Sequence, residues 1–297
     1  MRHTGKRILT FLLSATLLGS LAMVGWQRHQ SQLAEDAYAR AEELAVHASR
    51  QETAIPEQAV IPLPTEPVEL QPSQEAPTAA PEALFTEEPA PQQESPAEVD
   101  PFAEELAQTD LAALRAVNPD VAGWIAIPDT PVSYPLMQGE DNEYYLNHTW
   151  DRKASSAGSI FLDRSAGATP DHFNTIVYGH RMINNSMFGS LKYYEDADYW
   201  KAHPYVYILD NAGVHRYEIF SVYEASVKSY TYQIGFADDT AKETFLQKCI
   251  GWSVVETGVT PTICDRILTL STCTGKGYDT RWVVQARLAA ADDTLSH

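Results

Sequence analysis

ILTLSTCTGKGYDTRWVVQARL, residues 267–288, is the stretch that decides the fold. Two runs of strand-like residues flank a loop with two glycines, a pattern typical of a β-hairpin. Successive side chains of a strand point to opposite faces, so Leu268 and Leu270 share one face and Cys273 lies on the other. If the two runs pair, Arg281 faces Cys273 on the more polar side. The stretch therefore predicts a core hairpin that places a thiol beside a guanidinium.

The hairpin and the chain before it have the sequence pattern of a β protein. Short apolar and aromatic runs alternate with Gly, Pro, Asn and Asp, which predicts strands at 123–127, 132–136, 159–163, 174–179, 205–209, 217–225, 267–273 and 281–288. Helices are expected at 102–117, ended by Asn118-Pro119, and at 240–251, with a capping box at Thr240 and an end at Gly251. Eight short strands predict a mainly β domain, built as a barrel or a sandwich.

The N-terminus predicts a membrane segment. Residues 8–26 carry no charge, and nineteen such residues just span a hydrocarbon core as a helix. The basic residues within 1–7 favour an N-terminus on the cytoplasmic side, so the rest of the chain faces outward. We expect an uncleaved, single-pass signal anchor. The alternative is a signal peptide cleaved near Ser20-Leu21-Ala22.

Two segments separate this anchor from the folded domain. Residues 27–53 are rich in Ala and Glu and predict a solvated helical stalk. Residues 54–101 hold eleven prolines and ten acidic residues with no basic one, a composition that cannot bury a core and favours an extended, disordered spacer. We expect this spacer to hold the domain away from the membrane, with a Pro-rich ligand for a partner as the alternative. The folded domain is expected at 102–290, followed by a tail at 291–297.

Charge and cysteine usage exclude several classes of function. The net charge of −19 argues against general nucleic-acid binding, which needs an excess of Lys and Arg. Three cysteines form no disulfide framework, and none has the spacing of a zinc site. No Gly-rich phosphate loop is present. We therefore expect neither a metal nor a cofactor.

The hairpin supplies the elements of thiol chemistry. A cation beside a thiol stabilises the reactive thiolate, and Arg281 can also donate to an oxyanion that forms when Cys273 attacks a carbonyl. Such chemistry needs a proton carrier, and His180 follows the run NTIVYG at the mouth of a predicted strand. The alternatives are a small buried cysteine, a surface arginine and an ordinary loop histidine. Cys249, on the apolar face of a predicted helix, is expected to be a core thiol.

Together these residues resemble the sortases, and class B in particular. The matching pieces are TLSTC at 269–273 with Arg281 downstream, YGHRMINNSMFGSL at 178–191, NPDVAGWIAIPDTPVSYPLMQGEDNEYYLNH at 118–148 and AGSIFLD at 157–163. MFGSL after the histidine and a helix-bearing insertion at about 229–258 indicate class B. The long acidic spacer departs from the family's pattern.

The resemblance implies a closed β-barrel of about eight strands with N-terminal helices and a helix inserted before the cysteine strand. It implies a cysteine transpeptidase of Gram-positive bacteria, with Cys273 as nucleophile, His180 as general acid and base, and Arg281 as substrate and oxyanion donor. The enzyme is expected to cut a C-terminal sorting signal of the Asn-Pro-x-Thr type after Thr. It would hold the protein as a thioacyl-enzyme and pass it to an amine of peptidoglycan or of a pilin.

The substrate groove is the least specified part of the site. The hydroxyls of Ser271 and Thr272, together with Tyr232 and Ile234, are expected to line it, and solvated strand and loop positions are the alternative for each. Two rival functions remain open at this point. A protease that hydrolyses the same thioester shares every catalytic residue, and a non-catalytic surface scaffold explains the anchor and spacer but not the Cys, His and Arg together.

Overall fold

The computed structural model describes residues 2–52, 100–166 and 173–289, and in the first helix it describes side chains only for residues 19–46 without 21 and 27. The tail at 291–297 and all but the last two residues of the predicted spacer lie outside the described residues. So do the side chains of the basic N-terminus and of the first part of the predicted anchor. No helix in the described part of the chain has enough apolar length to cross a membrane.

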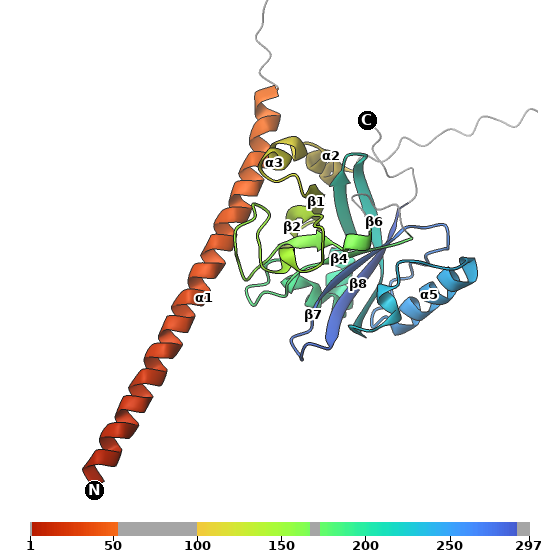
Figure 1. Cartoon of the computed structure of the whole chain (residues 1–297). Coiled ribbons are helices and arrows are strands. Elements are labelled where there is room, and N and C mark those ends of the chain that lie inside the picture. Colours follow the sequence, from red (N-terminus) through yellow and green to blue (C-terminus); the bar gives the residue numbers. More distant parts are fainter. Residues whose placement is uncertain (1, 53–99, 167–172, 290–297) are drawn as a thin grey trace, which may run out of the picture.

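Eight strands close into a barrel, as the sequence predicts (Figure 1). Their order around the barrel is β1-β2-β3-β4-β7-β8-β6-β5. The strands are β1 (Val121–Ala126), β2 (Ser133–Met137), β3 (Ile160–Leu162), β4 (Asn174–Tyr178), β5 (Tyr205–Asp210), β6 (Gly213–Ser226), β7 (Ile267–Cys273) and β8 (Thr280–Leu288). Strand β7, the first run of the opening stretch, lies parallel to β4 and antiparallel to β8. This arrangement brings the ends of three strands together at one rim of the barrel.

Both faces of β7 are buried, although one of them is polar. Leu268 and Leu270 point into the barrel, where they join the main core. Thr269 and Ser271 lie on the outer face and are also buried, because other elements cover that face. The sequence therefore separates the two faces correctly, but the polar face is not solvated.

Helices surround the barrel at its ends and on its outer face. They are α1 (Arg2–Glu52), α2 (Pro101–Ala107), α3 (Leu111–Val117), α4 (Ala197–Ala202) and α5 (Asp239–Trp252), with short 3₁₀ helices η1 (Tyr144–Leu146), η2 (Arg164–Ala166), η3 (Gly189–Glu195) and η4 (Tyr230–Tyr232). Helix α5 packs Phe245, Leu246 and Cys249 against the outer face of β6, β7 and β8, where they form a second apolar cluster with Val283. This cluster covers the base of the strands that carry the thiol and the guanidinium.

Two helix predictions need correction. The expected helix at 102–117 is two helices, because the Asp110 carboxylate caps a new helix by accepting a hydrogen bond of 2.8 Å from the backbone N–H of Ala113. The later helix is capped by Asp238, not by Thr240, and it runs through Gly251 to Trp252. In both cases a carboxylate, which accepts from free N–H groups at a helix start, sets the boundary.

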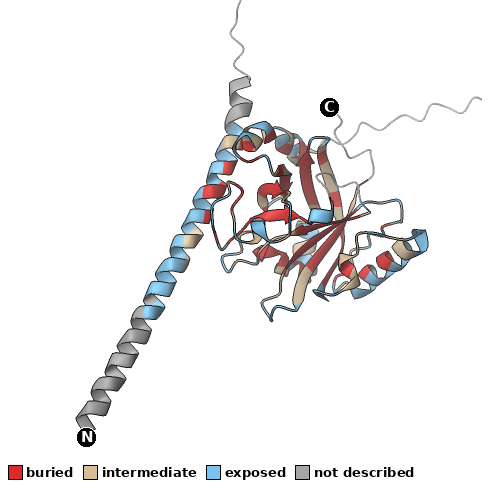
Figure 2. Cartoon of the chain, in the orientation of Figure 1, coloured by how far each residue is buried: buried red, intermediate tan, exposed pale blue. Residues whose placement is uncertain are grey.

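Helix α1 is not a solvated stalk. Small side chains along one stripe of the helix, with one tyrosine among them, are buried against the barrel (Figures 1 and 2); they are Ala34, Ala37, Tyr38, Ala41 and Ala45. The helices on both sides of residues 53–99 therefore pack on the same domain. The spacer predicted at 54–101 lies almost wholly outside the described residues, whereas α1, which precedes it, itself contacts the domain.

Candidate active site

The hairpin places Cys273 and Arg281 directly opposite each other. Cys273 is the last residue of β7, and its partner in the antiparallel ladder is Arg281 near the start of β8. Opposed residues of such a ladder share a face, with Cβ atoms about 4.5–5.5 Å apart. Both residues are partly exposed, whereas the strand below them is buried. The thiol and the guanidinium therefore lie together at an open rim.

His180 reaches the same rim from the neighbouring strand. In the parallel pairing of β4 with β7, Tyr178 faces Ser271, and the Gly179 N–H donates to the Ser271 carbonyl at 3.2 Å. His180 lies two residues beyond Tyr178, as Cys273 lies two residues beyond Ser271, so both follow the same paired end of β4 and β7. Glycine is required at 179, since a Cβ there would overlap the Phe188 ring.

The imidazole of His180 is held by a backbone carbonyl. His180 Nε2 lies 2.8 Å from the carbonyl oxygen of Leu146, at the end of η1. A carbonyl can only accept a hydrogen bond, so Nε2 carries a hydrogen and Nδ1 is the nitrogen left to exchange a proton. The contact fixes the ring and its tautomer in the way that a carboxylate does in other Cys–His and Ser–His sites.

The guanidinium of Arg281 is held by its own loop. Arg281 Nη1 donates to the carbonyl oxygens of Tyr278 at 2.8 Å and Thr280 at 3.0 Å. An arginine has five N–H donors, and these two bonds use the two of Nη1. Three donors, on Nε and Nη2, remain in a fixed orientation for a substrate oxygen.

Two tyrosines close the site beside the thiol. The rings of Tyr178 and Tyr232 stack with centroids 6.5 Å apart, and the hydroxyl groups bond to Asp163 and Ser271 respectively. Burial raises the pKa of both phenols, and the Asp163 carboxylate raises that of Tyr178 further. The positive charge of Arg281 acts on both phenols in the opposite direction. The field of this arginine therefore extends over the surface next to the thiol.

The four predicted groove residues are not equivalent. Tyr232 and Ile234 are partly exposed, and Ser271 of β7 is buried beneath Tyr232, with 2.9 Å between the two hydroxyl oxygens. Thr272 lies on the opposite face, toward the barrel interior, and is 2% exposed. The structure thus places Ser271 and Tyr232 on the face of β7 that carries Cys273, and Thr272 on the other face, because adjacent residues of a strand point in opposite directions.

Sequence reasoning missed a buried asparagine that holds this wall in place. The Asn174 side chain donates to the carbonyl oxygens of Thr231 and Gln233, at 3.1 and 2.9 Å, and accepts from the Thr269 hydroxyl at 2.7 Å. These bonds tie the Tyr232 segment to both β4 and β7. The only signal in the sequence was an asparagine at the start of the apolar run NTIVYG.

The other two cysteines lie apart from the rim. Cys249 is fully buried on the inner face of α5, as expected, and burial raises the pKa of its thiol to about 11. Cys264 is exposed on the connection that leads to β7, and all three cysteines are free. Of these thiols, only that of Cys273 has an arginine on one neighbouring strand and a histidine just beyond the end of the other.

Comparisons with known proteins agree with this geometry. A sortase domain matches residues 125–289. Sortase B of Listeria monocytogenes is 41% identical over 182 residues, which cover 60% of this chain and 74% of that protein. Sortase B of Staphylococcus aureus is 32% identical over 187 residues, with 62% and 77% covered. Among solved structures, the Staphylococcus aureus sortase B–substrate complex is similar with a TM-score of 0.58 and 32% identity, covering 61% of this chain and 84% of that one. Clostridium perfringens sortase B has a TM-score of 0.57 and 32% identity, with 60% and 99% covered.

Proposed function

The chain belongs to the sortase family and is a sortase B-type cysteine transpeptidase, and we propose that it cuts a C-terminal sorting signal of the Asn-Pro-x-Thr type after Thr. The cleaved protein then passes from the enzyme to an amine. The observation that carries this proposal is the pairing of Cys273 with Arg281 at the rim of the barrel, with His180 two residues beyond the paired end of the neighbouring strand. No other arrangement in the described part of the chain puts a thiol beside a proton carrier and an anion donor.

The three residues divide the chemistry between them. The thiolate of Cys273 attacks the Thr carbonyl carbon while Arg281 donates to the oxygen that becomes negative. The C–N bond then breaks, the leaving amine takes a proton from His180, and a thioester remains on the enzyme. An incoming amine attacks the thioester, gives its proton to His180 and restores the thiolate. One amide is exchanged for another, so the reaction needs no external energy source.

The sorting signal is proposed to lie against the wall formed by Tyr232 and Ile234. Both side chains are partly exposed, Tyr232 bonds to Ser271 of β7, and Asn174 holds the segment that carries them. Ser271 supports this wall through its bond to the Tyr232 hydroxyl and does not itself reach the peptide. Thr272 is not part of this proposal, because it faces the interior of the barrel.

The acceptor is proposed to be an amine of a peptidoglycan precursor or of a pilin, reached from the outer surface of the membrane. The uncharged stretch 8–26 is proposed to anchor the chain, with its N-terminus inside. The docked stripe of α1 begins at Ala34, eight residues beyond this stretch, and eight helical residues rise only about 12 Å. The catalytic domain is therefore proposed to lie beside the membrane.

A product analysis tests the proposed reaction. The full chain is incubated with a peptide that carries Asn-Pro-Gln-Thr followed by Gly, with and without an oligoglycine or a diaminopimelate-type amine, and the products are identified by mass spectrometry. A ligated product that disappears in Cys273→Ala is the expected result. Hydrolysis alone with every amine would show that the enzyme acts as a protease on this peptide. An unchanged yield in Cys273→Ala would contradict the proposed nucleophile.

A further inference from the structure

We propose that helix α1 positions His180 for proton transfer, so that its docking on the barrel sets the rate of acyl transfer. This inference rests on the role proposed above for His180. It concerns a part of the chain outside the matched sortase domain, which begins at residue 125. Helix α1 contacts both of the segments that hold the imidazole.

The first of these segments is the loop that follows the histidine. The Phe188 N–H donates to the His180 carbonyl at 2.9 Å and closes the loop, while Asn185 and Met187 adopt left-handed backbone conformations with φ of 65° and 55°. Such conformations are costly for residues other than glycine and persist only where the surroundings hold them. The Tyr134 hydroxyl provides this hold by accepting from the Met187 N–H at 3.0 Å.

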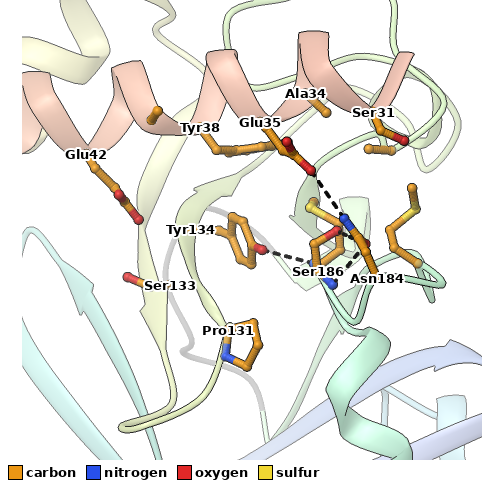
Figure 3. A pocket seen from close by; sticks show the side chains of 14 residues that line it. Ser31, Ala34, Glu35, Tyr38, Glu42, Pro131, Ser133, Tyr134, Asn184 and Ser186 are labelled. Atoms are coloured by element: carbon orange, nitrogen blue, oxygen red, sulfur yellow. Dashed lines mark hydrogen bonds between the residues drawn. The ribbon is translucent and has the colours of Figure 1, made fainter. Parts of the chain in front are cut away.

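Helix α1 secures Tyr134 and the tip of the same loop. The Tyr38 ring packs edge-on against the Tyr134 ring, with centroids 5.1 Å apart. Asn184, at the loop tip, lies 3.5 Å from the Glu35 carboxylate, the limit of a hydrogen bond. Figure 3 shows α1 passing over Tyr134 and the loop. An open pocket of about 240 Å³ lies between them. Movement of α1 away from the barrel would therefore release the loop behind His180.

The second segment carries the carbonyl that holds the imidazole. Leu146 accepts from His180, and the chain then continues to Gly158, whose φ of 58° places its backbone against Leu146. A Cβ at Gly158 would lie 2.6 Å from the Leu146 oxygen. The Tyr38 hydroxyl of α1 donates to the Gly158 carbonyl at 2.5 Å. One tyrosine of α1 thus supports the histidine loop through Tyr134 and the Leu146 carbonyl through Gly158.

Two further contacts fix α1 to the second segment. The Trp150 indole N–H donates to the Ala37 carbonyl at 2.7 Å, and both residues are buried. Arg40 forms an ion pair of 3.0 Å with Asp151, whose side chain is 4% exposed. Because these contacts lie on the same stretch of helix as Tyr38, the helix and the two supports of His180 form one packed unit.

A tyrosine-to-phenylalanine pair tests the connection through Tyr134. In the full chain, Tyr134→Phe keeps the ring contact with Tyr38 and removes only the bond to the Met187 N–H. We expect the single-turnover acylation rate to fall about fivefold, because one hydrogen bond contributes a free energy that corresponds to about this factor. KM for the sorting peptide should stay unchanged. Tyr207→Phe is the control, since it also removes one hydrogen bond, the 2.7 Å bond from the Tyr207 hydroxyl to Asp100. Tyr207 lies on β5, the strand farthest from β4 in the barrel order. A Tyr134→Phe enzyme that acylates at the wild-type rate would overturn the proposal.

A second pair tests the docking of the whole helix. Ala41→Glu places a carboxylate at a fully buried position of the stripe. Val46→Glu is the control, because it places the same carboxylate at an exposed position of the same helix. We expect Ala41→Glu to expose the α1 amides to deuterium exchange and to lower kcat without a matching rise in KM. Exposure of the helix without any loss of kcat would refute the proposal. If Ala41→Glu does not fold, Tyr134→Phe decides the question alone. Full activity of His180→Ala, in contrast, would refute the function proposed for the histidine itself.

Discussion

Replacement of Arg281 by lysine is the most informative single change at the rim. Both Nη1 hydrogens of the arginine are used by the Tyr278 and Thr280 carbonyls, which leaves three donors in a rigid plane for the substrate. A lysine ammonium has three donors in total and no fixed plane, so two bonds to the loop leave only one for an oxyanion. The substitution therefore removes at least one donor from the site, while the positive charge is preserved.

The expected size of the effect follows from that count. Loss of one oxyanion donor lowers kcat by about 10²–10³-fold, or about 3–4 kcal/mol. The assay is kcat and KM on a fluorescence-quenched sorting peptide, with thermal unfolding as a check on the fold. Arg287→Lys is the matched control, because Arg287 lies on the same strand in an ion pair of 2.6 Å with Glu218 that a lysine can retain. Equal kcat for Arg281→Lys and the wild type, or equal losses in the two variants, would refute the reasoning.

Three further predictions concern the parts of the domain that support the rim. Because burial raises the pKa of the Cys249 thiol to about 11, this thiol stays protonated up to and beyond pH 9 in the folded protein, so iodoacetamide should label Cys264 and leave Cys249 intact until the protein unfolds. Labelling of Cys249 in the native protein at pH 8 would contradict this. Phe245→Ala should destabilise the domain by about 3–5 kcal/mol in urea unfolding, since the ring is fully buried between α5 and the strands. A loss below about 1 kcal/mol would show that α5 contributes little. Asp110→Ala should cost about 1 kcal/mol through loss of the α3 cap, whereas Asp110→Asn should cost little.

The sequence predicted the eight strands well because they are short, apolar and separated by turn residues, whereas their closure into a barrel was an expectation from the resemblance to sortases. The strand at 267–273 is found as Ile267–Cys273, and the one at 205–209 as Tyr205–Asp210. The largest extension is that of β6, which begins at Gly213 in the turn and not at residue 217. The alternation of side chains also predicted that Cys273 and Arg281 would share a face, which the register bears out.

The features that the sequence did not predict depend on contacts between distant segments. The Leu146 carbonyl that holds His180 belongs to the backbone, so no residue type in the sequence indicates it. Helix α1 has the alanine and glutamate composition of a solvated helix, and only tertiary contact shows that its alanines allow close packing. Thr269 and Ser271 are buried polar residues because Asn174 and Tyr232, far away in sequence, satisfy their hydroxyls.

Direct identification of the acyl-enzyme tests the central claim most closely. The full chain is mixed with a sorting peptide in the absence of an amine, quenched in acid within the first turnover, digested and analysed by tandem mass spectrometry. A thioester that joins the Cys273 sulfur to the Thr carbonyl of the cleaved peptide is expected, and it should form much more slowly in His180→Ala. An adduct on Cys264 or Cys249, or cleavage of the peptide without any bond to Cys273, would contradict the account.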